Sequence, residues 1–174
     1  MKWAIFTLLF TFIPFVSHSV AAESLQQLID ETSPHSTLYL KNKTYEGPVI
    51  ISKPITIIGD KETKILSLST GIKIEDTNNI TLQALQFETK QAPILVEDSE
   101  EIEFKNLNLI IDENGVEFYR VKNVTLSSLQ IEGKKEGHFS KKPNGVSLFE
   151  GEQITVNKLS VKNIQDGMYF ERTK

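Results

Sequence analysis

The chain has 174 residues, with 19 Lys and Arg against 23 Asp and Glu, a formal net charge of −4 and no cysteine. Proteins bind phosphate backbones through clustered Lys and Arg, so this mildly acidic chain is not expected to bind nucleic acid. Without cysteine, neither a disulfide framework nor a lipid-bearing cysteine can form.

Residues 1–22 have the layout of a secretory signal peptide. Lys2 supplies the positive start, an apolar run follows from residue 4 to residue 16, and small residues come at Ser19, Ala21 and Ala22. The run is too short to span a bilayer comfortably, and cleavage after Ala21 or Ala22 fits. We therefore expect a domain of residues 23–174 in an extracytoplasmic location (secreted, periplasmic or cell-surface). It is not expected to be an integral membrane protein once the signal is cleaved.

A short helix is predicted at the start of this domain. Ser24 and Gln27 have the spacing of a capping box, and Leu25, Leu28 and Ile29 form one apolar stripe. No segment after residue 34 shows sustained helical periodicity.

Two patterns alternate through the rest of the chain. One is Gly-apolar-x-apolar, and the other is apolar-x-apolar-x-x-Leu-x-apolar. Successive copies are 22 residues apart, except that 30 residues separate Val116 from Val146. The first pattern begins at Gly71, Pro93 (a variant), Gly115, Gly145 and Gly167, and the second begins at Ile80, Ile102, Val124 and Ile154.

Each apolar-x-apolar pair is the alternation of a half-buried strand, and turn-forming Gly, Asn, Asp and Ser lie between the pairs. One repeat is therefore about three short strands joined by tight turns, which cannot bury an apolar face alone. Stacked repeats create a continuous core, so we predict an all-β, right-handed parallel β-helix with coils of about 22 residues. The alternative, a β-sandwich of irregular hairpins, gives no reason for a constant register. In one coil the inward positions would be Val116, Phe118, Val124, Leu126, Leu129 and Ile131, and outward positions include Glu117, Tyr119 and Thr125.

The two ends of the predicted β-helix differ. The N-terminal helix would cover the first coil, whose core and strand edges would otherwise be exposed. At the other end the pattern stops in mid-coil at Lys174. We therefore expect either a truncated copy of a longer protein or a last coil closed by a partner, with self-association through this open coil as one way to close it.

Residues 25–60 resemble the opening of NosD-like periplasmic β-helix proteins, within a wider group of carbohydrate-binding proteins and sugar hydrolases. The resemblance implies export and a parallel β-helix. NosD-like proteins act with an ATP-driven transporter in maturing a copper enzyme, nitrous oxide reductase, so it also implies an accessory role with protein partners. This chain is far shorter, and Asp60-Lys61-Glu62 stands where a Gly-rich stretch is often found. The matching segments are the Leu25/Leu28/Ile29 helix, Thr37-Leu38-Tyr39-Leu40, Thr44-Tyr45-Glu46-Gly47-Pro48, Lys53-Pro54-Ile55-Thr56-Ile57-Ile58-Gly59, Asn144-Gly145-Val146 and Asp166-Gly167-Met168.

The residues do not predict a metal site or a catalytic set. Soft copper sites use Cys, Met or His, but the mature chain has no Cys, and its His35 and His138 lie in different regions.

The register stacks one charged residue per coil into a column. This column is either a surface ion ladder or a substrate-binding strip, with calcium at its acidic members if the protein is lyase-like. Its members are Asp76, Asp98, Arg120, Glu150 and Arg172, with Asp76 and Asp98 as the calcium candidates.

Aromatic residues and a lysine-rich insertion are the candidate ligand-binding features. Tyr119 and Phe149 should point outward and stack, with Tyr169 outward in the following coil; such a group either binds sugar rings or stabilises the sheet. The insertion, residues 132–144, either binds an acidic polymer or is a tolerated surface loop. The candidate ligand-binding residues are Tyr119, Phe149, Tyr169, Arg120, Lys134, Lys135, His138, Lys141 and Lys142.

These features favour an exported, non-catalytic β-helix module that binds a polysaccharide or an envelope protein. Two alternatives remain open at this point. The first is a polysaccharide lyase or hydrolase, or the N-terminal fragment of one, which would need an acidic cluster that the register does not provide. The second is the NosD-like accessory role.

Overall fold

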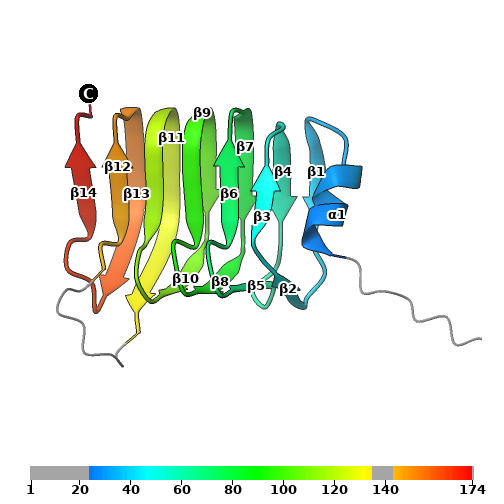
Figure 1. Ribbon diagram of the computed structural model, residues 1–174, viewed down its shortest axis with the longest axis horizontal. Coiled ribbons are helices and arrows are strands. Elements are labelled where there is room, and N and C mark those ends of the chain that lie inside the picture. Colours follow the sequence, from blue (N-terminus) through cyan, green and yellow to red (C-terminus); the bar gives the residue numbers. More distant parts are fainter. Residues whose placement is uncertain (1–23, 135–142, 174) are drawn as a thin grey trace, which may run out of the picture.

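The computed structural model describes residues 24–134 and 143–173; the predicted signal peptide therefore lies outside the described residues. Short strands wind around one axis in successive coils, and equivalent strands of neighbouring coils pair in parallel (Figure 1). The chain is thus a right-handed parallel β-helix, as the repeat predicts.

The coils present three faces, each made of one strand segment per coil. The first face contains β3 (Val49–Ile51), β6 (Ile72–Glu75), the starts of β9 (Ile94–Lys105) and β11 (Val116–Gly133), β12 (Val146–Phe149) and β14 (Met168–Glu171). The second contains β1 (Ser36–Tyr39), β4 (Ile55–Ile58), β7 (Asn78–Gln83), later parts of β9 and β11, and the start of β13 (Glu152–Lys162). The third contains β2 (Thr44–Glu46), β5 (Lys64–Ser67), β8 (Gln86–Thr89), β10 (Asn108–Ile111) and the ends of β11 and β13.

The pairing register confirms the 22-residue period. Ile72 pairs with Ile94, and Ile102 pairs with Val124. Val116 pairs with Val146 although 30 residues separate them. The extra residues therefore form an insertion between coils that leaves the ladder in register.

The core consists of the inward positions of the coils. The six inward residues predicted for the coil of β11 are all at most 2% exposed, which confirms the alternation. The rings of Phe104 and Phe118 pack with their centroids 5.8 Å apart and their planes tilted by 31°. Burying each such side chain contributes roughly 1.5–3 kcal/mol.

The prediction of three separate strands per coil is wrong for much of the solenoid. Strands β9, β11 and β13 continue around the corners. They do so because single residues in the left-handed region turn the chain without interrupting the ladder, as Arg120, Asn123 and Ser128 do within β11, with φ values of 53°, 54° and 58°. This region is sparsely populated by residues other than Gly and Asn, so the stacked neighbouring coils hold these corners in place.

Helix α1 (Leu25–Glu31) covers the first coil, as predicted (Figure 1). The side chain of Gln26 in this helix accepts a hydrogen bond from the backbone N–H of Ile50 (2.8 Å) and donates one to the Ile50 carbonyl (3.1 Å). The Gln26 amide therefore satisfies the backbone hydrogen-bonding groups of Ile50 at the edge of β3. The capping box is only half formed: Ser24 accepts from the Gln27 N–H, but the Gln27 side chain donates to Glu31. Within the described part of the chain, no helix combines the length and apolar character needed to cross a membrane.

Glycine recurs at the start of the first face in successive coils, at Gly71, Gly115, Gly145 and Gly167. No glycine in residues 24–134 and 143–173 has a positive φ, so conformational freedom does not explain why glycine recurs there. A Cβ built on Gly145 would instead lie 2.7 Å from the carbonyl oxygen of Gly167 in the next coil. The backbones of successive coils approach too closely here for a side chain.

Replacing Gly145 with alanine is therefore expected to lower the free energy of unfolding by about 1–3 kcal/mol, the range for overpacking. Gly167→Ala is the matched control, because the nearest atom to its new methyl group, Cγ2 of Val161, would be 3.6 Å away, an ordinary contact. Urea unfolding of both variants measures the difference. Equal losses would contradict the close-approach explanation.

Candidate binding site

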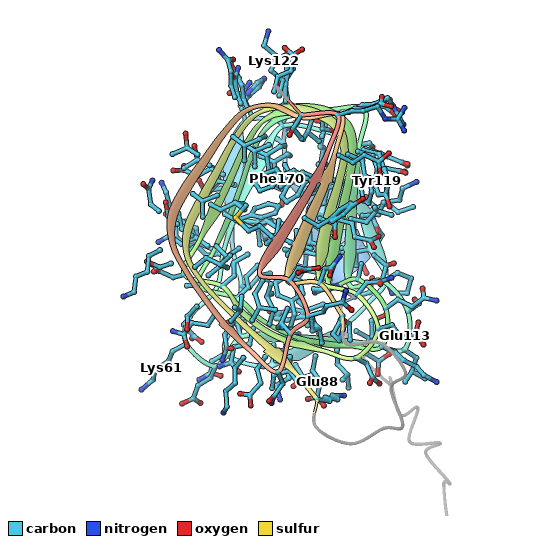
Figure 2. The ribbon with its side chains drawn as sticks, turned by 90° about the vertical axis from the view of Figure 1, so that its left-hand side faces the viewer. Lys61, Glu88, Glu113, Tyr119, Lys122 and Phe170 are labelled. Carbon is cyan, nitrogen blue, oxygen red and sulfur yellow. The ribbon has the colours of Figure 1, made fainter. Side chains whose placement is uncertain are left out.

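Three aromatic side chains point outward from the first face in consecutive coils. Tyr119 of β11 is the register partner of Phe149 of β12. Tyr169 of β14 is paired with Ser147, which lies two residues before Phe149 in β12. We call Tyr119, Phe149 and Tyr169 the aromatic row. Tyr119 lies on the outside of the coil, whereas Phe170 points inward (Figure 2).

The geometry of the aromatic row confirms the predicted stack and limits how it could meet a ligand. The rings of Tyr119 and Phe149 are 4.7 Å apart and within 8° of parallel, so their facing surfaces cover each other. Tyr169 is tilted by 52° against Phe149 at 5.7 Å and is 39% exposed. Its hydroxyl donates to the carboxylate of Glu171 at 3.3 Å. A ligand would thus meet ring edges and the tilted Tyr169 rather than three flat faces.

Glu117 is the residue at this face that sequence reasoning missed. It lies two residues before Tyr119 on the same outward side of β11, between Leu95 of β9 and Ser147 of β12. Its side chain is half-buried, and this burial raises the pKa of its carboxyl. Within residues 24–134 and 143–173 the carboxyl has no hydrogen bond or ion pair. A half-buried carboxyl without a partner can accept a hydrogen bond from a ligand, so Glu117 is a candidate binding residue. Register could have pointed to it, since Glu117 occupies the same column as Tyr169.

Further toward the N-terminus, the same face holds an ammonium group of the chain itself. Lys73 of β6 places Nζ 2.6 Å from Oε2 of Glu75 and 2.9 Å from Oε2 of Glu97 in the next coil. The two carboxylates raise the pKa of Lys73 well above its ordinary value.

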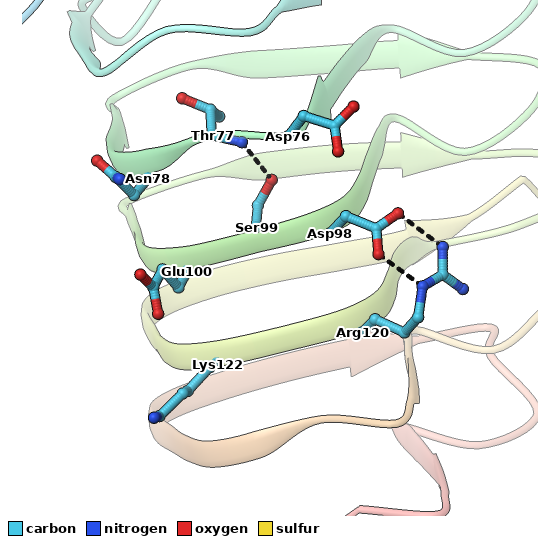
Figure 3. A pocket seen from close by; sticks show the side chains of 8 residues that line it. All are labelled: Asp76, Thr77, Asn78, Asp98, Ser99, Glu100, Arg120 and Lys122. Carbon is cyan, nitrogen blue, oxygen red and sulfur yellow. Dashed lines mark hydrogen bonds and ion pairs between the residues drawn. The ribbon is translucent and has the colours of Figure 1, made fainter.

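The charged column at the corner after the first face contains two ion pairs, Arg120 with Asp98 and Arg172 with Glu150. Arg120 donates from Nε to Oδ1 of Asp98 (2.6 Å) and from Nη2 to Oδ2 (2.8 Å), as Figure 3 shows. This bidentate pair lowers the pKa of Asp98. Further along, Arg172 lies 3.1 Å from Glu150. All four side chains are largely exposed, so these ion pairs contribute modest stability.

A shallow groove of about 460 Å³ runs along this corner, with Asp98 and Arg120 on one side and Glu100 and Lys122 on the other (Figure 3). In the part of the chain that the structure describes, no group of three or more His, Cys, Asp or Glu side chains could hold a metal ion. Of the two calcium candidates, Asp98 already has both oxygens bonded to Arg120. At the place where calcium binding was one of the two expectations, the groove therefore contains the ion pair of Asp98 with Arg120.

The lysine-rich insertion is described only at its two ends, residues 132–134 and 143–144. Lys134 lies 3.4 Å from Oε1 of Glu88 on the third face, and Figure 2 shows Glu88 and Tyr119 on different sides of the coil. The structure therefore does not bring Lys134 to the aromatic row. Four further predicted residues fall outside the described part of the chain: Lys135, His138, Lys141 and Lys142.

The fold and its outward side chains define a parallel β-helix protein with an aromatic row on one face. No family model matches the chain, and no curated protein matches it. Among solved structures, the pectin methylesterase from Aspergillus niger in deglycosylated form is similar at 10% sequence identity with a TM-score of 0.30, covering 87% of this chain and 85% of that one. A likeness this weak carries no functional argument, and the NosD-like resemblance stays a prediction.

Proposed function

We propose that the protein is an exported, non-catalytic β-helix module that binds carbohydrate on its first face, across the coils of β11, β12 and β14. The observation that carries this proposal is the aromatic row, with the unpaired carboxyl of Glu117 beside it. Sugars offer both apolar C–H surfaces and hydroxyl groups. Aromatic side chains together with a nearby hydrogen-bonding carboxyl suit that combination.

The scaffold supports this proposal because it holds the row rigidly. Tyr119 and Phe149 stand on paired strands whose inward neighbours, Phe118 and Leu148, are fully buried. Little conformational entropy would therefore be lost when a ligand binds, and preorganised sites gain affinity in this way. A linear glycan could contact several coils at once, since coils repeat at roughly 4.8 Å.

The argument against a lyase rests on the corner column. A lyase of this fold would need a basic residue free to accept a proton, and Arg120 is the basic residue nearest to the aromatic row in sequence. The bidentate pair with Asp98 raises the pKa of Arg120 further, so its guanidinium stays charged and cannot act as a base.

The test is retention of the mature protein in affinity gels that contain a panel of polysaccharides. The double variant Tyr119→Ala/Phe149→Ala is expected to weaken binding by about tenfold or more, equivalent to about 1.4 kcal/mol, with an unchanged circular dichroism spectrum. Tyr39→Ala is the matched control, because Tyr39 is an aromatic residue on the second face and is 73% exposed. Unchanged retention of the double variant would remove the aromatic row from the function.

A further inference from the structure

The carboxylates of the first face are arranged to hold positive charge. In the coils of β6 and β9, the chain supplies that charge itself, because Lys73 places its ammonium between Glu75 and Glu97 at 2.6 and 2.9 Å. An ammonium in one outward column of this face can therefore pair with carboxylates of the neighbouring column.

Two coils after Lys73, the same outward column holds the carboxyl of Glu117 in place of a cation. The outward column that starts with Lys73 continues with Leu95, Glu117, Ser147 and Tyr169. No lysine or arginine occupies the first-face parts of these strands, which are residues 116–119 of β11, β12 and β14. At the adjoining corner Arg120 is paired with Asp98 and Arg172 with Glu150. The half-buried carboxyl of Glu117 therefore stands beside the aromatic row without a partner of opposite charge.

We propose that the ligand of the aromatic row is an amino sugar, whose protonated amine pairs with Glu117 while its ring contacts Tyr119 and Phe149. This inference rests on the proposed function and names the class of sugar. An ammonium is attracted by a carboxylate, and the carboxyl of Glu117 adjoins the apolar rings of the aromatic row. A uronic acid polymer would place its carboxylates against Glu97, Glu117 and Glu171, so it is disfavoured by charge repulsion.

Binding of such a ligand has a defined pH dependence. The groups around Glu117 are Leu95 and Glu97 of β9, Ser147 and Phe149 of β12, and Tyr119 of its own strand; none is a cation, and Glu97 is already paired with Lys73. Burial raises the pKa of Glu117, and an ammonium pairs with the ionised form. Affinity therefore rises as the pH increases through the pKa of Glu117 and falls again when the sugar amine loses its proton, giving a bell-shaped profile.

The experiment is titration calorimetry of the mature protein with two tetrasaccharides that differ only in the amine: the glucosamine tetramer and the N-acetylglucosamine tetramer. At about pH 6, where a carboxylate and an amine can both be charged, the glucosamine tetramer is expected to bind about tenfold more tightly, as a hydrogen bond to a charged group would give. Glu117→Gln should abolish this preference and flatten the rising limb of the pH profile.

Glu101→Gln is the control for a general effect of net charge. Glu101 is exposed at the corner before the second-face part of β9, with a φ of 56° that glutamine can equally adopt, and its loss should leave the preference unchanged. If both tetramers bind equally and Glu117→Gln has no effect, while Tyr119→Ala/Phe149→Ala still abolishes binding, the amino-sugar inference is wrong and the proposed function stands. If neither tetramer binds but another glycan is retained through the aromatic row, the inference is again overturned. If no glycan is retained, both proposals fail.

Discussion

Replacing Phe118 with alanine is expected to lower the free energy of unfolding by about 3–5 kcal/mol. The Phe118 side chain is fully buried in the coil of β11, and its ring packs against Phe104 of the preceding coil. The surrounding strands are hydrogen-bonded to coils on both sides, so they cannot collapse into the cavity that the substitution leaves. The cost should therefore lie toward the upper end of the range.

Urea unfolding measures this loss through the shift in midpoint at an unchanged slope. Phe118→Leu should cost less than about 1.5 kcal/mol, because it keeps most of the apolar volume. Tyr119→Ala removes an aromatic ring of similar size from the outward side of the same strand, and it should cost clearly less. If Phe118→Ala and Tyr119→Ala were equally destabilising, the core would not be the main source of stability in this coil.

The coil register could be predicted from the sequence because two independent requirements fix it. Alternation sends Val116 and Phe118 inward, and parallel pairing places equivalent residues side by side. A slip by one residue would expose every inward side chain of a coil. This is why Val116 meets Val146 across the longer interval, and why the stacking of Tyr119 on Phe149 could be predicted from spacing alone.

The continuous strands could not be predicted in the same way. Propensity places turns at Gly, Asn and Asp, but the corner residues in the left-handed region include Glu101, Arg120 and Lys158. These residues rarely adopt that conformation by themselves. Their backbone is held by pairing with the coils on either side, and this is a tertiary effect that local sequence does not record.

The candidate site was predictable only in part, for a related reason. Spacing identifies which side chains point outward, but not how deeply neighbours bury them. Glu117 is half-buried because of its surroundings in three dimensions, and its alternation pattern is the same as that of exposed outward residues. The ion pair of Lys134 with Glu88 likewise depends on the path that the chain takes as it leaves the third face.

The double variant Leu25→Ala/Ile29→Ala is expected to remove helix α1 from the first coil, at a cost of at least about 2–5 kcal/mol. Both side chains are only 1% exposed. A helix of seven residues is not stable by itself in water, so its packing on the core is what keeps it in place. Its departure would also withdraw the Gln26 amide from the backbone of Ile50, leaving a strand edge free to pair with another chain.

The expected result is therefore a lower urea midpoint together with faster amide exchange at Ile50 and concentration-dependent light scattering. Gln27→Ala is the control on the same helix, since Gln27 is exposed and its side chain bonds to Glu31 alone among the residues that the structure describes. If the double variant were as stable and as monomeric as Gln27→Ala, the first coil would not depend on the helix for cover. Protection of the β3 edge would then have to come from the strand itself, and the short length of β3, three residues, would be the property to test next.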